Sequence, residues 1–259
     1  MSPSRLLSHW RGLLLSLVGI AAIAWLAATG RLGLYIHPRY FVFTIVMAVI
    51  AGVVAIVAFA LLPGADEADD DHDHDHNHDD YPQRPWARRW SAVGTVALVV
   101  VTAGALLLVP PTTLTTSTVE NRAMNASAAD SADAVPQLVG GDSSAFTVKD
   151  WAGLLRSGAD PAFLADAEPT VVGFVTPDPD DPENVFYVAR FIVTCCAVDA
   201  QPVGVPIYLP GWQDEYPVDS WVEATGRFVE NPSTSSMQPT VLDAATLAAT
   251  TQPADPYVY

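Results

Sequence analysis

A run of alternating histidine and acidic residues is the part of this sequence best suited to chemistry. Imidazole and carboxylate groups are ligands for zinc, nickel and cobalt. In an extended segment, side chains two positions apart share one side, so several histidines could converge on one ion. The run has no apolar residue to fold around, which predicts a loose collector of cations rather than a rigid site. Its candidate ligands are His72, His74, His76, His78, Asp71, Asp73, Asp75 and Asp79. A solvated acidic loop is the alternative, but aspartates alone would solvate a loop equally well.

The only two cysteines, Cys195 and Cys196, form a second candidate metal site, with Asp199 as a third ligand. They follow each other at the end of a predicted strand, and in a regular strand they would face opposite sides. Both thiolates can therefore reach one ion only if the chain bulges or turns there. One alternative is a redox pair that changes oxidation state. The other is a passive pair of one core residue and one exposed thiol.

Three stretches without charged residues or histidines predict transmembrane helices. Each reaches or approaches the ~20 apolar residues that cross a bilayer core, and continuous apolar runs in hydrocarbon must be helical to satisfy their own backbone. The predicted spans, within a transmembrane region 1–111, are residues 12–30, 40–62 and 91–109. The His/Asp-rich loop 66–80 lies between the second and the third. A cleaved signal peptide is the alternative for the first stretch.

Arginines beside the third span predict its orientation, because positive residues favour the cytoplasmic side. Three arginines lie just before this span, and none follows it until Arg122. We therefore expect a cytoplasmic N-terminus, a cytoplasmic His/Asp-rich loop and an extracytoplasmic C-terminal part. Arg31 and Arg39, in the predicted outer loop, oppose this orientation. His37, in the same loop, is interpreted as an interfacial residue.

Composition excludes some classes of function. The net charge is -17, and residues 66–80 supply eight Asp and one Glu. Phosphate binding needs concentrated Lys and Arg, so no nucleic-acid partner is expected, whereas acidic surfaces suit cations. The sequence has no nucleophile elbow, phosphate loop, dinucleotide-binding turn or HExxH helix. We therefore predict that the protein is not an enzyme.

The C-terminal half is predicted to be a small, mainly β soluble domain over residues 145–250. Residues 112–144 are rich in Thr, Ser, Ala and Asp, which predicts a flexible linker. Residues 251–259 are predicted to form a tail. Thr147 is a candidate N-cap for a helix Val148–Ser157, and residues 161–167 predict another helical turn. Five short strands predict a barrel or a sandwich, with an OB-like barrel preferred. Their ranges are 170–176, 185–194, 203–209, 220–229 and 240–243. The expected fold class is an α+β membrane protein.

Residues 190–204 carry the pattern RFxxxCCxxDAxPxG and resemble the YcgQ-like family of bacterial permease subunits. Those proteins join hydrophobic N-terminal helices to a soluble domain of unknown function. A WVxxxG strand starting at Trp221 also fits. The resemblance implies a bacterial cell-membrane location and a separate multi-span permease as partner, with metal-ion export or handling as the task. Besides Cys195, Cys196 and Asp199, the motif nominates Arg190, Phe191, Pro202, Gly204, Trp221 and Gly226.

The resulting functional hypothesis is an accessory subunit of a permease that handles divalent metal ions. The predicted spans hold no ionisable residue, whereas an intramembrane cation pathway normally needs one, so the chain is not expected to conduct ions alone. Expected partners are the permease, membrane lipid and divalent cations, with zinc or another divalent transition metal as the cofactor. One alternative is an extracytoplasmic redox or metal-sensing protein that uses the vicinal cysteines. A structural membrane anchor for a binding barrel is another.

Overall fold

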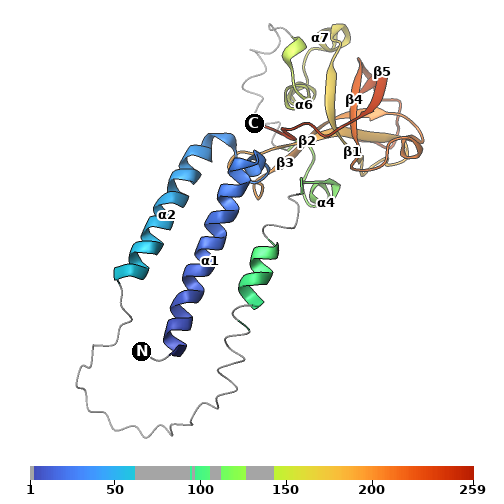
Figure 1. Ribbon diagram of the computed structural model, residues 1–259. Coiled ribbons are helices and arrows are strands. Elements are labelled where there is room, and N and C mark those ends of the chain that lie inside the picture. Colours follow the sequence, from blue (N-terminus) through green and yellow to red (C-terminus); the bar gives the residue numbers. More distant parts are fainter. Residues whose placement is uncertain (1–2, 62–93, 95–96, 106–111, 127–142) are drawn as a thin grey trace, which may run out of the picture. The chain divides into compact units, whose positions relative to one another are not determined.

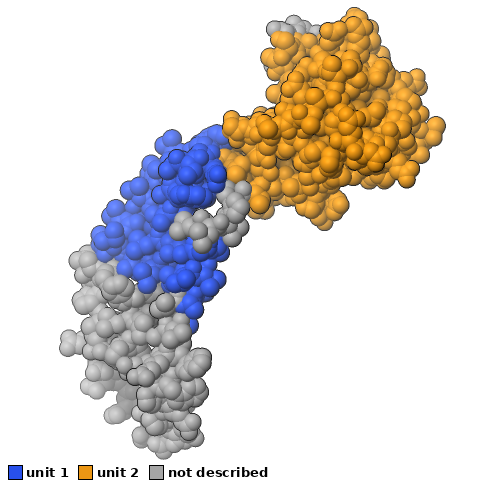
Figure 2. All heavy atoms as spheres, turned by 45° about the vertical axis from the view of Figure 1, so that its right-hand side comes forward, with its two compact units in different colours: residues 1–32, 38–111 blue, residues 33–37, 112–259 orange. Residues whose placement is uncertain are grey.

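A computed structural model describes residues 3–61, 94, 97–105, 112–126 and 143–259. The chain forms two compact units, coloured separately in Figure 2. One consists of residues 1–32 and 38–111, and the other of residues 33–37 and 112–259. The short segment 33–37 therefore belongs to the same unit as the C-terminal part of the chain. The His/Asp-rich loop 66–80, with all its predicted ligands, lies outside the described residues.

The first unit is built on two helices that lie side by side, α1 (Pro3–Ala28) and α2 (Phe41–Leu61) (Figure 1). The short 3-10 helices η1 (Arg31–Leu34) and η2 (Pro38–Tyr40) connect them. One helix in the described part of the chain, Pro38–Ala58, is long and apolar enough to cross a membrane, and Leu13–Ala28 is a shorter apolar helix. Residues 97–105 are helical, and most of the remaining residues of the third predicted span lie outside the described residues. Three transmembrane helices were predicted, and among the described residues one helix meets the requirements of both length and apolar character.

The second unit contains a closed five-stranded barrel. Its strands are β1 (Thr170–Pro177), β2 (Val185–Ile192), β3 (Gln201–Tyr208), β4 (Trp221–Glu230) and β5 (Thr240–Thr250). They are joined in the order β1-β2-β3-β5-β4, and β4 pairs with β1 to close the ring. Only the β3–β5 contact among these pairs is parallel. The structure is thus α+β, and of the two predicted alternatives it contains a barrel, not a sandwich.

A β-bulge in β5, where Ala245 is the extra residue, interrupts its pairing with β4, and such a bulge bends its strand and increases the twist. The register between β4 and β5 shifts at Thr225 and Gly226. A Cβ atom at Gly226 would overlap the carbonyl group of Asp243, so only glycine lets the two backbones approach this closely. Gly226, a motif residue, therefore has a structural role in the barrel.

The helices α6 (Val148–Ser157) and α7 (Pro161–Asp166) come directly before β1 in the sequence. The Asp150 carboxylate accepts hydrogen bonds from the Thr147 backbone N–H at 2.8 Å and from its hydroxyl at 2.7 Å, which holds the start of α6. Gly158 ends the helix in a left-handed conformation with φ 68°, which glycine adopts at little cost. Trp151 and Leu154 are fully buried in the barrel core. The predicted helix 148–157 is confirmed.

The outer face of β1, β2 and β3 is covered by residues 112–126, which we call the strap. Aromatic residues on that face, including Phe174, Tyr187 and Phe191, form a second apolar cluster. From the strap, Leu114, Val119 and Met124 pack against this cluster. The strap holds a short helix, α4 (Thr116–Val119), shown beside the barrel in Figure 1. Part of the predicted flexible linker is therefore a packed element, because it covers apolar surface that the barrel would otherwise expose to water.

The tail predicted over residues 251–259 also joins the fold. Its strand β6 (Tyr257–Val258) pairs in parallel with β2. Tyr257 is buried and its hydroxyl accepts a hydrogen bond from the Leu114 backbone N–H of the strap at 3.3 Å. The tail and the strap thus cover the outer face of β2 together.

Asn125 fixes the end of the strap to β3. Its amide nitrogen donates to the Gly204 carbonyl at 3.0 Å, and its amide oxygen accepts from the Gly204 N–H at 2.7 Å. Its own N–H donates to the Pro202 carbonyl at 3.0 Å. Asn125 has φ 60°, a left-handed conformation that asparagine tolerates better than most residues.

We expect Asn125→Ala to destabilise the barrel by about 2–4 kcal/mol, because two buried backbone groups of Gly204 lose their partners and alanine is strained at positive φ. Asn125→Gly removes the amide without the strain, so it should be less destabilised. Urea-induced unfolding of the full-length protein in detergent, followed by tryptophan fluorescence, measures both changes. Wild-type stability in Asn125→Gly would contradict a role for the amide.

Candidate functional site

The two cysteines lie in a tight loop between β2 and β3, which we call the cysteine loop (residues 193–200). The sequence predicted a strand to residue 194, but β2 ends at Ile192, so the pair lies in irregular chain that turns. One ligand atom from each of Cys195, Cys196 and Asp199 lies within 4.8 Å of the other two. Cys195 is exposed, Cys196 is partly buried, and no disulfide joins them. The predicted grouping of these three residues is present.

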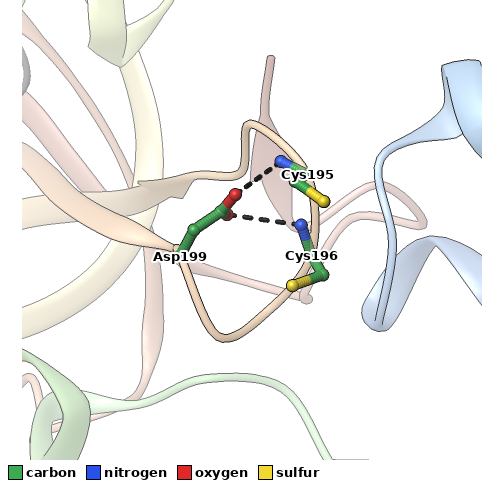
Figure 3. A group of neighbouring side chains, drawn as sticks. All are labelled: Cys195, Cys196 and Asp199. Carbon is green, nitrogen blue, oxygen red and sulfur yellow. Dashed lines mark hydrogen bonds between the residues drawn. The ribbon is translucent and has the colours of Figure 1, made fainter.

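The carboxylate of Asp199 organises the loop. It accepts three consecutive backbone N–H groups, from Thr194 at 3.2 Å, Cys195 at 2.7 Å and Cys196 at 3.3 Å. Figure 3 shows the nitrogens of both cysteines facing this carboxylate. Successive N–H groups that point inward form an anion-binding concavity. The anion in this concavity is the Asp199 carboxylate of the same loop. The chain bends tightly enough to bring both cysteine sulfur atoms near Asp199.

The arrangement suits a thiophilic divalent cation. In a tetrahedral zinc site with Zn–S bonds of about 2.3 Å, neighbouring ligand atoms lie roughly 3.5–4 Å apart, so small side-chain rotations would bring these three groups onto one ion. A carboxylate offers about four lone-pair positions. Oδ2 of Asp199 accepts one of the three hydrogen bonds and keeps a lone pair for a metal. Three ligands leave a fourth tetrahedral position for another group.

The segment 33–37 pairs with the cysteine loop by an antiparallel bridge between Ile36 and Cys196. The His37 N–H donates to the Cys195 carbonyl at 3.0 Å, and the Ala197 N–H donates to the Tyr35 carbonyl at 2.8 Å. An isolated bridge with one backbone hydrogen bond on either side thus joins the cysteine loop to the connection between α1 and α2.

The strap contacts the cysteine loop from a different part of the sequence. The Arg122 guanidinium donates to the Val198 carbonyl at 2.9 Å, although the Val198 side chain is 83% exposed. Arg122 thus contributes a positive charge beside a loop that carries two thiols and a carboxylate. Two segments distant in sequence, 33–37 and the strap, restrain the same loop.

The other motif residues stabilise the neighbouring sheet and strap. The Arg190 guanidinium lies 5.5 Å from the centroid of the Trp221 ring and donates to the Asp255 carbonyl at 3.2 Å. Burial lowers the pKa of Arg190, and the nearby Asp255 opposes that shift. Phe191 stacks on Phe174 with ring centroids 5.4 Å apart. The carbonyl of Pro202 and the backbone of Gly204 are the groups that Asn125 holds. None of these motif side chains belongs to the cysteine–aspartate group.

Sequence reasoning did not identify His37 or Arg122 as neighbours of the cysteine loop. His37 was interpreted as an interfacial residue, but its backbone pairs with that of Cys195. Arg122 lies 76 positions before the residue that accepts its hydrogen bond. Contacts over such sequence separations leave no periodic signal. The one available clue was that His37 lies close to the start of a predicted span.

The fold and the site define a class of protein in which a helical pair with an apolar helix precedes a closed β-barrel bearing a thiol–carboxylate loop. Residues 11–125 match the DUF1980 N-terminal domain, and residues 158–259 match the DUF1980 C-terminal domain. The chain thus carries both domains of DUF1980, consistent with the YcgQ-like proteins that its motif resembles. No curated protein and no solved structure matches it. The strap lies at the end of the N-terminal match, and the cysteine loop lies within the C-terminal match.

We expect Asp199→Asn to loosen the cysteine loop, because a neutral amide replaces the charged acceptor of three N–H groups and hydrogen bonds to charged groups contribute about 1.5–3 kcal/mol each. Backbone hydrogen exchange at residues 194–196 should accelerate at least about tenfold. Mass spectrometry of peptides from the full-length protein measures this change. Asp243→Asn, at an exposed position on β5, is the control. Equal exchange in both variants would contradict the organising role of Asp199.

Proposed function

We propose that this chain is an accessory subunit of a bacterial permease and that its barrel domain binds a divalent transition-metal ion at Cys195, Cys196 and Asp199. The observation that carries the proposal is the convergence of these three ligand atoms within 4.8 Å of one another. Two thiols of one chain meet here without a disulfide, in a loop that bends around the third ligand. This geometry differs from that of a regular strand, where neighbouring side chains diverge.

The donor set favours zinc among the common biological cations. Thiolates bind soft and borderline ions such as zinc and copper(I), whereas magnesium and calcium prefer oxygen ligands. The position of the loop also fits exchange with another molecule, because Cys195 is exposed. A site that accepts and releases metal needs such an accessible ligand, and a buried structural site does not.

The helices fit a membrane location. Pro38–Ala58 is long and apolar enough to span a bilayer, and the arginines before residue 91 favour a cytoplasmic position for loop 66–80. In this proposal the His/Asp-rich loop collects divalent cations on the cytoplasmic side, and the barrel domain binds metal on the opposite side.

The accessory role follows from the character of the helices. Ion pathways normally require polar or ionisable groups within the membrane, and residues 12–30, 40–62 and 91–109 contain no acidic, basic or histidine side chain. A separate permease would provide the pathway. This chain would supply metal-binding segments on the two sides of the membrane.

A second candidate function is thiol-based redox sensing, favoured by the neighbouring positions of Cys195 and Cys196 outside regular structure. Oxidation by an external disulfide would join the two sulfur atoms. It would release two protons and two electrons, which reduce the oxidant to two thiols. The ring formed by adjacent cysteines is strained, and oxidation would remove the thiolate ligands needed for metal.

Zinc binding by the barrel domain should depend on both cysteines. To isolate the site, the four histidines of loop 66–80 are replaced by asparagine in the full-length protein, which is then purified under reducing conditions. This parent should bind one zinc ion per chain in competition with a chromophoric chelator. Cys195→Ser and Cys196→Ser should each weaken binding at least about a hundredfold, since a hydroxyl is a poor substitute for a thiolate. Unchanged affinity in both variants would refute the metal site.

The accessory role predicts a physical complex and a metal phenotype. The tagged protein should co-purify with a multi-span permease, and cells with serine at both cysteines should lose tolerance to excess zinc. If the redox alternative holds, alkylation of the thiols should abolish function while deletion of residues 66–80 leaves it intact. Wild-type tolerance after replacement of both cysteines and all four loop histidines would exclude the metal-handling proposal.

A further inference from the structure

We propose that His37 is the fourth protein ligand of the metal site, so that the site is completed by the connection between α1 and α2. This inference rests on the proposed function of Cys195, Cys196 and Asp199. It adds a residue from the DUF1980 N-terminal match, residues 11–125, to a cluster that lies within the C-terminal match, residues 158–259.

The register of the bridge carries the inference. Ile36 pairs with Cys196, so the next residue, His37, lies opposite Cys195, as its hydrogen bond to the Cys195 carbonyl at 3.0 Å shows. Residues directly opposite each other on an antiparallel pair project to the same face, with Cβ atoms about 4.5–5.5 Å apart. The imidazole of His37 and the thiol of Cys195 thus start from adjacent points of the two hydrogen-bonded backbones.

The imidazole has a defined position from which it can turn to the metal. Its ring packs edge-on against the Tyr259 ring, with the centroids 4.6 Å apart. This orientation does not place it in the group formed by the two cysteines and Asp199. Rotation about its side-chain torsions between staggered positions would direct a ring nitrogen toward an ion at the cysteine sulfur atoms.

The charges of the other ligands also favour histidine. Two thiolates and one carboxylate carry three negative charges against the two positive charges of zinc. A neutral imidazole fills the fourth tetrahedral position without adding repulsion, and sets of cysteine and histidine ligands are common for this ion. Arg122, bound to the Val198 carbonyl, offsets part of the remaining negative charge at the loop.

The position of His37 gives the site a means of release. His37 lies just after η1 and immediately before η2, in the connection between the two helices. Separation of segment 33–37 from the cysteine loop would withdraw one ligand while the other three remain on their own loop. A site with three protein ligands holds its metal less tightly and can accept a group from another molecule at the fourth position.

The test uses the full-length parent in which the four histidines of loop 66–80 are asparagine. We expect His37→Asn to weaken zinc binding at least about tenfold and to remove imidazole scattering from the zinc X-ray absorption spectrum. His37→Cys should retain tight binding but lose the imidazole signal. His9→Asn, in α1, is the matched control and should change neither quantity. The backbone bonds of the bridge do not involve the replaced side chain, and urea-induced unfolding checks that the variants fold.

The outcomes separate this inference from the proposed function. If Cys195→Ser abolishes zinc binding while His37→Asn leaves the affinity and the imidazole signal unchanged, the histidine assignment is wrong and the cysteine site stands. If the parent binds no zinc, both proposals fail. A loss of affinity in His37→Asn without any imidazole signal in the parent would also overturn the assignment, because the histidine would then act only through the loop.

Discussion

Burial of both faces of β2 is the constraint on which the C-terminal unit depends. Val188 points into the barrel core, whereas Tyr187 and Phe191 belong to a second cluster on the outside. A sheet with two apolar faces must be covered on both, and the barrel itself covers only one. The strap and β6 cover the other. A segment that precedes the barrel in sequence and one that follows it are thereby held against one strand.

The position of the cysteine loop follows from that constraint. The loop begins where β2 ends, so the elements that cover the outer face of β2 also reach the loop. Arg122 extends from the strap to the Val198 carbonyl, and His37, which pairs with Cys195, also contacts Tyr259 beyond β6. The apolar packing of the sheet and the arrangement of the candidate ligands are therefore parts of one structure, and a change in one is expected to affect the other.

Local patterns in the sequence predicted the elements whose determinants are local. The helix 148–157 was predicted from its spacing and its cap at Thr147, and four of the five barrel strands have nearly the predicted bounds. The fifth, β5, extends to Thr250 instead of residue 243, because its exposed outer half lacks an apolar pattern. The strap was interpreted as a linker because most of its residues are small or polar. Its few apolar contacts, made by Leu114, Val119 and Met124, form no periodic pattern. The cysteine–aspartate group was predicted from three nearby residues, but the bridge to residue 36 spans 160 positions and has no local signal.

The strap changes what counts as a complete barrel domain. The C-terminal DUF1980 match begins at residue 158, after α6, whose Trp151 lies in the core, and long after the strap that covers the outer face. A fragment cut at that point would expose aromatic surface on β1 and β2 and leave the backbone of Gly204 without its asparagine partner. The domain boundary in the sequence is therefore not a boundary in the folded protein. A fragment chosen for expression of the barrel domain, or for replacing the barrel domain of a related protein, should include the end of the N-terminal domain.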